Sequence, residues 1–205
     1  MTSITIPDGV TSIGEFAFTY CSSLTRIEIP DSVTEIGNSA FGYCSSLTSI
    51  EIPDSVTSIG YGAFENCHSL TEMTLPFVGA TKGGEENTHL GYIFGASSYL
   101  ENIDYVPASL KKVTVTGGSI GYCAFYNCSS LTSVVLGDGV ASIGRFAFMG
   151  CNNLTSLTFE DTNTWYVATN ATDWENKAGG TEIPVVDDVQ NATYFLYSDQ
   201  YWYKK

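Results

Sequence analysis

The amino-acid sequence repeats itself with a period of 23 residues. Five cysteines and five phenylalanines follow this period, apart from one longer interval after Cys67. They are Cys21, Cys44, Cys67, Cys128 and Cys151, together with Phe18, Phe41, Phe64, Phe125 and Phe148. A repeat of this length is typical of a solenoid, in which every unit buries its apolar face on its neighbours. The chain is therefore expected to fold as a stack of similar layers in which no unit folds alone.

One half of each unit predicts a strand and a corner. Leu24, Ile27 and Ile29 form the pattern L-x-x-I-x-I, whose last two residues alternate with a polar one, as in a half-buried strand. Pro30 cannot donate a hydrogen bond to a continuing ladder, and Asp31 favours a turn through side-chain to backbone bonding. The strand is expected to end there, and stacked copies should form a parallel sheet on one face.

The other half of each unit predicts a return path. Val33 and Ile36 should point inward, while Phe41 and Cys44 lie three residues apart, which is the spacing of one helical turn. We therefore expect short helical or irregular segments on the face opposite the sheet.

Seven layers can be counted from their leading apolar residues. These are Met1, Leu24, Leu47, Leu70, Leu110, Leu131 and Leu154. The interval from Leu70 to Leu110 is 40 residues and contains a Gly-rich, partly acidic excursion at about residues 76–109. This excursion is either an insertion that serves binding, since tolerated insertions in repeats map to loops, or a neutral one.

The repeat pattern ends near residue 159. Residues 1–159 are predicted to form the solenoid, and residues 160–205 a small, aromatic-rich and β-rich capping module. Two alternating runs around Ser198 and Asp199 predict that this module closes in a β-hairpin. Met1 stands where Leu47 does in its unit, so the sequence opens inside a repeat. We expect either a fragment of a longer protein or an open end that pairs with a second copy.

The repeated segment IPDSVTSIGYGAFENCHSLTEMTLP, residues 52–76, resembles the BspA-like leucine-rich repeats, also called the treponemal type. The resemblance covers residues 1–159 apart from the excursion, and the C-terminal block is similar to segments that accompany such repeats in surface proteins of gut bacteria. It implies a leucine-rich-repeat solenoid, in a secreted or cell-surface protein that binds host or bacterial proteins in adhesion. It does not imply an enzyme. The sequence contains no signal-peptide or anchor pattern, so the extracellular or cell-surface location rests on the resemblance alone.

The charge balance argues against phosphate-rich partners. The chain has 8 Lys and Arg residues against 22 Asp and Glu residues, which gives a net charge of -14. Because basic residues supply most of the affinity for phosphates, neither a nucleic acid nor an anionic membrane surface is expected as a partner. No apolar run approaches the roughly 20 residues that a bilayer requires, so no membrane span is expected.

The spacing of the cysteines favours packing over chemistry. The five periodic cysteines occupy equivalent positions, so they should form an inward column of free thiols. Stacked strands lie within disulfide range, but parallel side chains are badly placed for bonding. Pro107 takes the same position in another unit, which indicates a site for a small apolar residue. Cys123 falls at a different, variable position, where we expect more exposure and a more reactive thiol.

Catalytic, metal and cofactor sites are not expected. The two histidines, His68 and His89, lie in no ligand motif, whereas a zinc site needs three or four converging ligands. Four aspartates recur at the corner of the units: Asp8, Asp31, Asp54 and Asp138. A column of these carboxylates could bind calcium, but a turn-capping role explains each copy better. No nucleophile with a base and an orienting group stands out, and there is no phosphate-binding glycine loop.

If the apolar strand residues point inward, the residues between them form an exposed face of the sheet. Most of them are small and hydroxylated, and the departures from this pattern are candidates for a partner-binding face. They are Arg26, Glu28, Glu51, Glu72, Lys111, Lys112 and Val135. Glu28, Glu51 and Glu72 are expected to form a carboxylate column beside two lysines, a charge contrast that guides partner choice. Aromatic anchors are absent from this face, which weakens the hypothesis.

Aromatic residues gather in the excursion and in the C-terminal block instead. Tyr92, Phe94 and Tyr99 are the candidate contacts of the excursion. The C-terminal rings are Trp165, Tyr166, Trp174, Tyr194, Tyr197, Tyr201, Trp202 and Tyr203. They could stack on the sugars of a glycan or cell wall, but a module of this size needs them for its own core.

Three functions agree with these patterns. The first is a protein-binding adhesion module that uses the sheet face and the excursion. The second is a carbohydrate-binding or cell-wall-binding module that uses the C-terminal aromatic residues. The third is an architectural spacer without a ligand.

Overall fold

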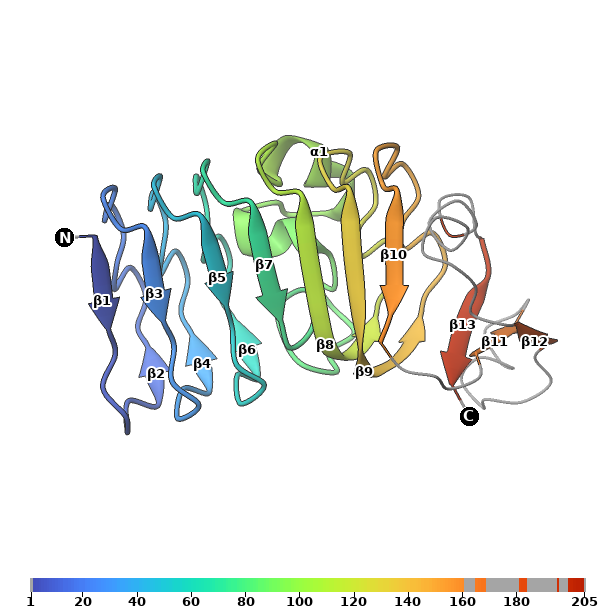
Figure 1. Ribbon diagram of the computed structural model, residues 1–205, viewed down its shortest axis with the longest axis horizontal. Helices are drawn as coiled ribbons and strands as arrows, with labels where there is room; N and C mark the ends of the chain where they lie inside the picture. Colours follow the sequence, from blue (N-terminus) through green and yellow to red (C-terminus); the bar gives the residue numbers. More distant parts are fainter. Residues whose placement is uncertain (1, 161–164, 169–180, 184–194, 196–198, 205) are drawn as a thin grey trace.

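The computed structural model describes residues 2–160, 165–168, 181–183, 195 and 199–204. Seven parallel strands lie side by side along the long axis and form the front face in Figure 1. They are β1 (Ser3–Thr5), β3 (Arg26–Glu28), β5 (Ser49–Glu51), β7 (Glu72–Leu75), β8 (Lys112–Ile120), β9 (Ser133–Ile143) and β10 (Ser156–Phe159). The protein is thus a solenoid of about seven turns, and the predicted fold class is confirmed.

The length of each front strand follows the residue at the corner. β3 and β5 end two residues before Pro30 and Pro53. In two later units Thr116 and Gly137 take the place of this proline, and β8 and β9 run on around the corner over 9 and 11 residues. Thr116 and Gly137 keep the backbone N–H that proline lacks. The ladder therefore continues there, with register shifts near the glycines.

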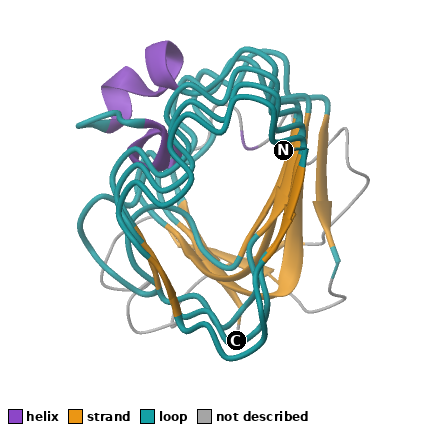
Figure 2. Ribbon diagram, turned by 90° about the vertical axis from the view of Figure 1, so that its left-hand side faces the viewer, coloured by secondary structure: helices purple, strands orange, loops and turns teal. Residues whose placement is uncertain are grey.

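A second, short parallel sheet forms another side of the solenoid. It contains β2 (Ser12–Ile13), β4 (Glu35–Ile36) and β6 (Ser58–Ile59). Figure 2 shows the two sheets as walls that loops connect. Ile13, Ile36 and Ile59 are buried between the walls and belong to one continuous apolar core with the inward residues of the front strands. The core is thus built from the periodic residues, one set for each layer.

The third side consists of tight turns stacked on one another. Phe18, Phe41 and Phe64 lie face to face, with ring centroids 5.3 and 5.2 Å apart. Ser39 and Tyr43 have positive φ angles, which interrupt a right-handed helix within a single turn. The spacing of three between phenylalanine and cysteine therefore reflects a repeated turn, and it corresponds to the irregular segments of the prediction rather than to helices.

The excursion stays within the stack. It contains η1 (Leu90–Phe94), η2 (Tyr99–Glu101) and α1 (Asn102–Tyr105). The Phe64 N–H donates to the carbonyl oxygen of Ile93, and the Leu90 N–H to that of Ala124, both at 2.8 Å. Thr81 also pairs antiparallel with β6. The excursion therefore completes one layer of the turn side and of the second sheet, behind the front face in Figure 1.

The C-terminal block continues the sheet with antiparallel strands. It contains β11 (Trp165–Ala168), β12 (Thr181–Ile183) and β13 (Tyr201–Lys204). β13 pairs with β11 on one side and with the end of β9 on the other. Of the predicted hairpin around Ser198 and Asp199, the second run is β13, whereas the first run lies outside the described residues except for Phe195.

Candidate interaction surface

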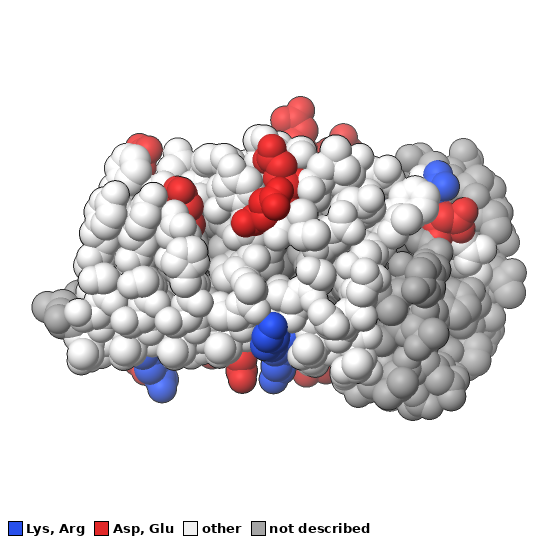
Figure 3. Space-filling model, turned by 90° about the horizontal axis from the view of Figure 1, so that it is seen from above, with Lys and Arg blue, Asp and Glu red and all other residues white. Residues whose placement is uncertain are grey.

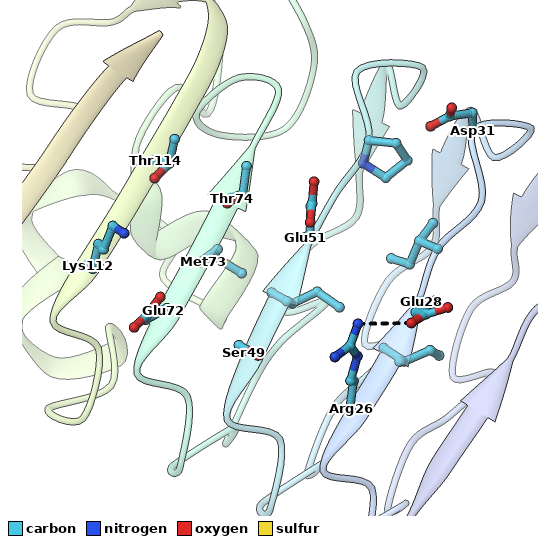
Figure 4. Close-up of a pocket in the computed structure, with 14 residues that line it drawn as sticks. Arg26, Glu28, Asp31, Ser49, Glu51, Glu72, Met73, Thr74, Lys112 and Thr114 are labelled. Atoms are coloured by element: carbon cyan, nitrogen blue, oxygen red, sulfur yellow. Dashed lines mark hydrogen bonds and ion pairs between the residues drawn. The ribbon is translucent and has the colours of Figure 1, made fainter. Parts of the chain in front are cut away.

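A groove with a volume of about 550 Å³ crosses the front sheet from β3 to β8. The backbone above the inward residues Ile27, Ile50 and Met73 forms its floor, and polar side chains surround it (Figure 4). Five of the seven predicted face residues line this groove. They are Arg26, Glu28, Glu51, Glu72 and Lys112.

The strand register arranges the side chains of the groove in two rows. The first row contains Arg26, Ser49, Glu72 and Lys112, and the second contains Glu28, Glu51, Thr74 and Thr114. The predicted column of Glu28, Glu51 and Glu72 is therefore wrong. Glu72 occupies the position of Ser49 in its unit and faces Lys112 on the next strand, because the register of the ladder follows position in the repeat and not residue type.

Most charges of the groove are unpaired. Arg26 Nη2 donates to Glu28 Oε1 at 2.9 Å, between side chains that are 73% and 70% exposed, so this pair adds little to stability. Within the described part of the chain, Glu51, Glu72 and Lys112 form no ion pair. Figure 3 shows the protein from above, at right angles to the view of Figure 1; most of this side is uncharged, and its charged residues lie in a few groups.

The hydrogen-bonded ladder of the front sheet is interrupted between β3 and β5. β1 and β3 form a two-stranded sheet, and β5 is the first strand of a separate one. The bond from the Thr48 N–H to the carbonyl oxygen of Thr25 is 3.4 Å long, whereas the equivalent bond from Thr71 to Thr48 is 2.8 Å long. β4 and β6 remain paired on the second sheet, so the opening is confined to the front face, where the groove lies.

Two predicted face residues lie outside the groove. Lys111 Nζ donates to the carbonyl oxygens of Ala108 at 2.7 Å and Ser130 at 3.3 Å, so its side chain folds back onto the loops that precede the strands. Val135 is half-buried on β9, beyond the last strand that lines the groove.

Other groove residues were missed as candidates by sequence reasoning. Ser49, Thr74 and Thr114 resemble every other hydroxylated residue of the face, and Asp31 was explained by the turn. The same 23-residue period that places Glu28 and Glu51 on the face of the sheet also places Ser49, Thr74 and Thr114 there. Position in the repeat could therefore have identified them as groove residues.

Of the three residues predicted as contacts of the excursion, Tyr92 and Tyr99 are partly accessible and Phe94 is not. Phe94 is 1% exposed, because η1 turns inward as a layer of the core, so the prediction of a contact there is wrong. Tyr92 is half-buried and packs edge-on against Tyr61, with ring centroids 5.5 Å apart. Tyr99 is half-buried and packs in the same way against Tyr122, at 5.6 Å. These rings lie on the turn side, and none of them lines the groove.

The periodic cysteines form a column of free thiols beside the phenylalanine stack. Cys44, Cys67 and Cys151 donate to the carbonyl oxygens of Phe18, Phe41 and Phe125, at 3.2, 3.2 and 2.9 Å. Burial raises the pKa of Cys44 to about 11 and the pKa values of Cys67 and Cys151 to about 12. The reactive thiolate form is therefore suppressed at neutral pH.

The expectation of an exposed Cys123 is wrong. Its side chain is 1% exposed, and burial raises the pKa of its thiol. The ring of the adjacent residue Tyr122 packs against Tyr99 of the excursion, with ring centroids 5.6 Å apart. Among the equivalent positions only Phe16, in the first layer, is exposed, at 59%, whereas Ser39 and Phe146 are half-buried and Gly62 is buried.

The described C-terminal rings pack into the apolar core that continues from the solenoid. Trp165, Trp202 and Tyr203 are buried, and Tyr166 stacks on Tyr203 with ring centroids 5.7 Å apart. The buried rings have no free face for a sugar. Tyr201 is half-buried, whereas Trp174, Tyr194 and Tyr197 lie outside the described residues.

The corner aspartates do not converge on a common point. Asp54 accepts a hydrogen bond from Thr116 Oγ1 at 2.5 Å, while Asp8 and Asp31 are exposed. Across the described ranges, no three Cys, His, Asp or Glu side chains are placed to hold a metal ion. In the same ranges, none of the helices has the length and apolar character needed to cross a lipid bilayer.

The family of the repeats is shown by comparison with known sequences. The BspA type leucine rich repeat region matches in six copies, over residues 1–113 and 92–171. The chain belongs to this family. BspA-type proteins are bacterial surface-type proteins, generally protein-interaction modules, and leucine-rich-repeat proteins are typically non-catalytic. No curated protein matches this BspA-type chain.

Solved leucine-rich-repeat proteins are similar to this BspA-type chain. One from Bacteroides ovatus is 29% identical with a TM-score of 0.52, and the match covers 76% of this chain and 36% of that one. Another from Eubacterium ventriosum is 26% identical with a TM-score of 0.56, and the match covers 77% and 39% of the two chains. The present chain therefore matches well under half the length of these relatives.

Proposed function

We propose that the chain is a non-enzymatic protein-interaction module of a bacterial cell-surface or secreted protein, with a role in adhesion to host or bacterial proteins. The observation that carries this proposal is the groove on the front sheet, which gathers six charged side chains on one open face. The surface location is supported by the BspA-type family.

The chemistry of the groove favours a protein partner over a small molecule. Small-molecule sites are mostly apolar and enclose their ligand, with only a few polar groups. This groove lies on the surface of a sheet and is lined by six charged residues among fourteen. The buried cysteines, whose thiols stay protonated, offer no accessible nucleophile beside it.

Binding to a panel of purified host matrix proteins and bacterial surface proteins, measured by surface plasmon resonance, tests this proposal. We expect at least one partner whose affinity falls at least tenfold when Glu72→Lys and Lys112→Glu are combined. Glu35→Lys on the second sheet is the control and should change affinity less than twofold. If no protein binds, or if the combined Glu72→Lys and Lys112→Glu variant binds with unchanged affinity, the proposal fails and a spacer role is favoured. If a glycan array is bound instead, the carbohydrate-binding alternative is favoured.

A further inference from the structure

We infer that the groove selects an extended, positively charged segment of a partner protein. The inference rests on the proposed function, because it assigns a chemical class to the partner of the same groove. It is carried by the balance of charge in the groove, by the position of one glutamate, and by the dimensions of the surface.

Carboxylates outnumber cations in the groove. Its lining contains two cationic side chains, Arg26 and Lys112, and four anionic ones, Glu28, Asp31, Glu51 and Glu72. Arg26 and Glu28 neutralise each other at 2.9 Å. The charge that remains for a partner is three carboxylates against one ammonium group, so a basic segment finds complementary charge and an acidic one is repelled.

Glu51 lies where the sheet gains nothing from its charge. Glu28 holds the equivalent position on β3, one strand away, and Thr74 lies opposite Glu51 on β7. Among the described residues Glu51 forms no ion pair, so its carboxylate is open to a cationic side chain from outside, and we assign Glu51 as the first anchor of the partner. Glu72 is the second, because it forms no ion pair with Lys112.

The dimensions of the groove fit a short length of extended chain. The groove crosses four strands, and three inter-strand steps of about 4.8 Å amount to about 14 Å. This is the length of about four extended residues at about 3.4 Å each. Glu51 and Glu72 lie one strand and two positions apart, which is about 8 Å and close to the distance between alternate residues of such a segment.

Fluorescence polarisation with three labelled eight-residue peptides tests the inference. In the first peptide Lys alternates with Ser, in the second Glu alternates with Ser, and the third contains only Ser and Gly. We expect the Lys peptide alone to bind, and the combined Glu51→Gln and Glu72→Gln variant to bind it at least tenfold more weakly. Lys112→Ala should strengthen binding about two- to threefold, because it removes the unpaired cation.

The control variant combines Glu15→Gln with Glu35→Gln. It removes the same two charges from exposed positions outside the front sheet, so the net charge of the two double variants is equal. Affinity for the Lys peptide should change less than twofold in this control. Equal losses in both double variants would mean attraction by the net charge of the protein, and the inference would be overturned.

The remaining outcomes separate this inference from the proposed function. If the Glu peptide binds and Lys112→Ala abolishes that binding, the inference is overturned, while the groove keeps its role in protein binding. If no peptide binds but a purified protein is captured through the groove, the partner is not an extended basic segment. If neither the peptides nor the proteins respond to groove variants, both the inference and the proposed function are overturned.

Discussion

Cys67 donates its thiol proton to the carbonyl oxygen of Phe41, which belongs to the preceding layer and lies 26 residues earlier in the sequence. The Sγ to oxygen distance is 3.2 Å, and Cys44 bonds to Phe18 at the same distance. The thiol therefore satisfies a backbone carbonyl group of the neighbouring layer and fills a small apolar space at the same time.

This thiol column should make the protein sensitive to alkali. Burial raises the pKa of Cys67 from 9.0 to about 12, so between these values the folded chain keeps a proton that the unfolded chain has lost. The resulting stabilisation is complete below pH 9 and is lost as the pH rises toward 12. In Cys67→Ala, the free energy of unfolding should fall by about 1–2 kcal/mol at pH 7. Above pH 9, the free energy of unfolding of Cys67→Ala should fall less steeply with pH than that of the unsubstituted protein, by about 1.4 kcal/mol per pH unit. Urea denaturation at pH 7, 9 and 10 measures both effects, and equal slopes in the two proteins would contradict the prediction.

The phenylalanine stack should contribute more in the middle of the solenoid than at its first layer. Phe41 is fully buried between two other rings, whereas Phe18 is half-buried and stacks on one side only. Phe41→Ala should lower the free energy of unfolding by about 3–5 kcal/mol. Phe18→Ala should cost clearly less, and urea denaturation of the two variants compares them. Equal losses would show that ring stacking between layers is not the source of the stability.

Close approach of consecutive layers should exclude a side chain at Gly60. A methyl group there would lie 2.3 Å from the backbone nitrogen of Asn38, whereas one at Gly14 would meet no atom within 4 Å. Gly60→Ala should therefore lower the free energy of unfolding by about 1–3 kcal/mol through overpacking. Gly14→Ala, the matched control, should cost less than about 0.5 kcal/mol. Thermal or urea denaturation distinguishes the two, and a tolerated Gly60→Ala would mean that the layers can separate.

Asn102 should hold the excursion on the stack. Its side chain is fully buried, with Oδ1 accepting from the Gly91 N–H and Nδ2 donating to the carbonyl oxygen of Tyr126, both at 2.9 Å. Asn102→Ala leaves both backbone groups without this partner and should cost about 2–3 kcal/mol. Hydrogen exchange should become faster at the Gly91 amide, while exposed Asp104→Ala on the same helix should leave it unchanged. Unchanged protection in Asn102→Ala would contradict this role.

The excursion should also loosen in acid. Burial lowers the pKa of His89, whose Nε2 lies 3.3 Å from the carbonyl oxygen of Ala96. The folded chain therefore keeps this ring neutral in a range where the unfolded chain protonates it. The stabilisation is present above the ordinary value of 6.5 and is lost as the pH falls below it. His89→Asn should weaken this acid dependence, whereas His68→Asn, at an exposed position, should keep it. Hydrogen exchange of residues 89–96 between pH 5 and 7 gives the measurement.

Position in the repeat predicts most of the solenoid from sequence. Ile27 and Ile50 point inward, and Arg26 and Glu28 outward, because identical layers give equivalent residues the same surroundings. The proline at the corner explains where β3 ends, and its replacement by Thr116 explains why β8 continues. These results follow from local chemistry that each unit repeats.

Features that occur once were predicted less well. Phe94 and Cys123 are buried because the excursion folds into the stack, and no second copy of the excursion shows how it does so. Glu72 was assigned to the wrong row because residue type was matched in place of position. The groove depends on an interruption between β3 and β5 that two nearly identical sequences do not predict.

Because each repeat adds one layer, the number of repeats sets the length of the front sheet. A duplicated unit of 23 residues placed between β3 and β5 would move Arg26 about 4.8 Å further from Lys112 and leave every other layer unchanged. Gain or loss of whole units would thus change the distance between the charged residues at the two ends of the groove in fixed steps, without altering the residues of any single layer.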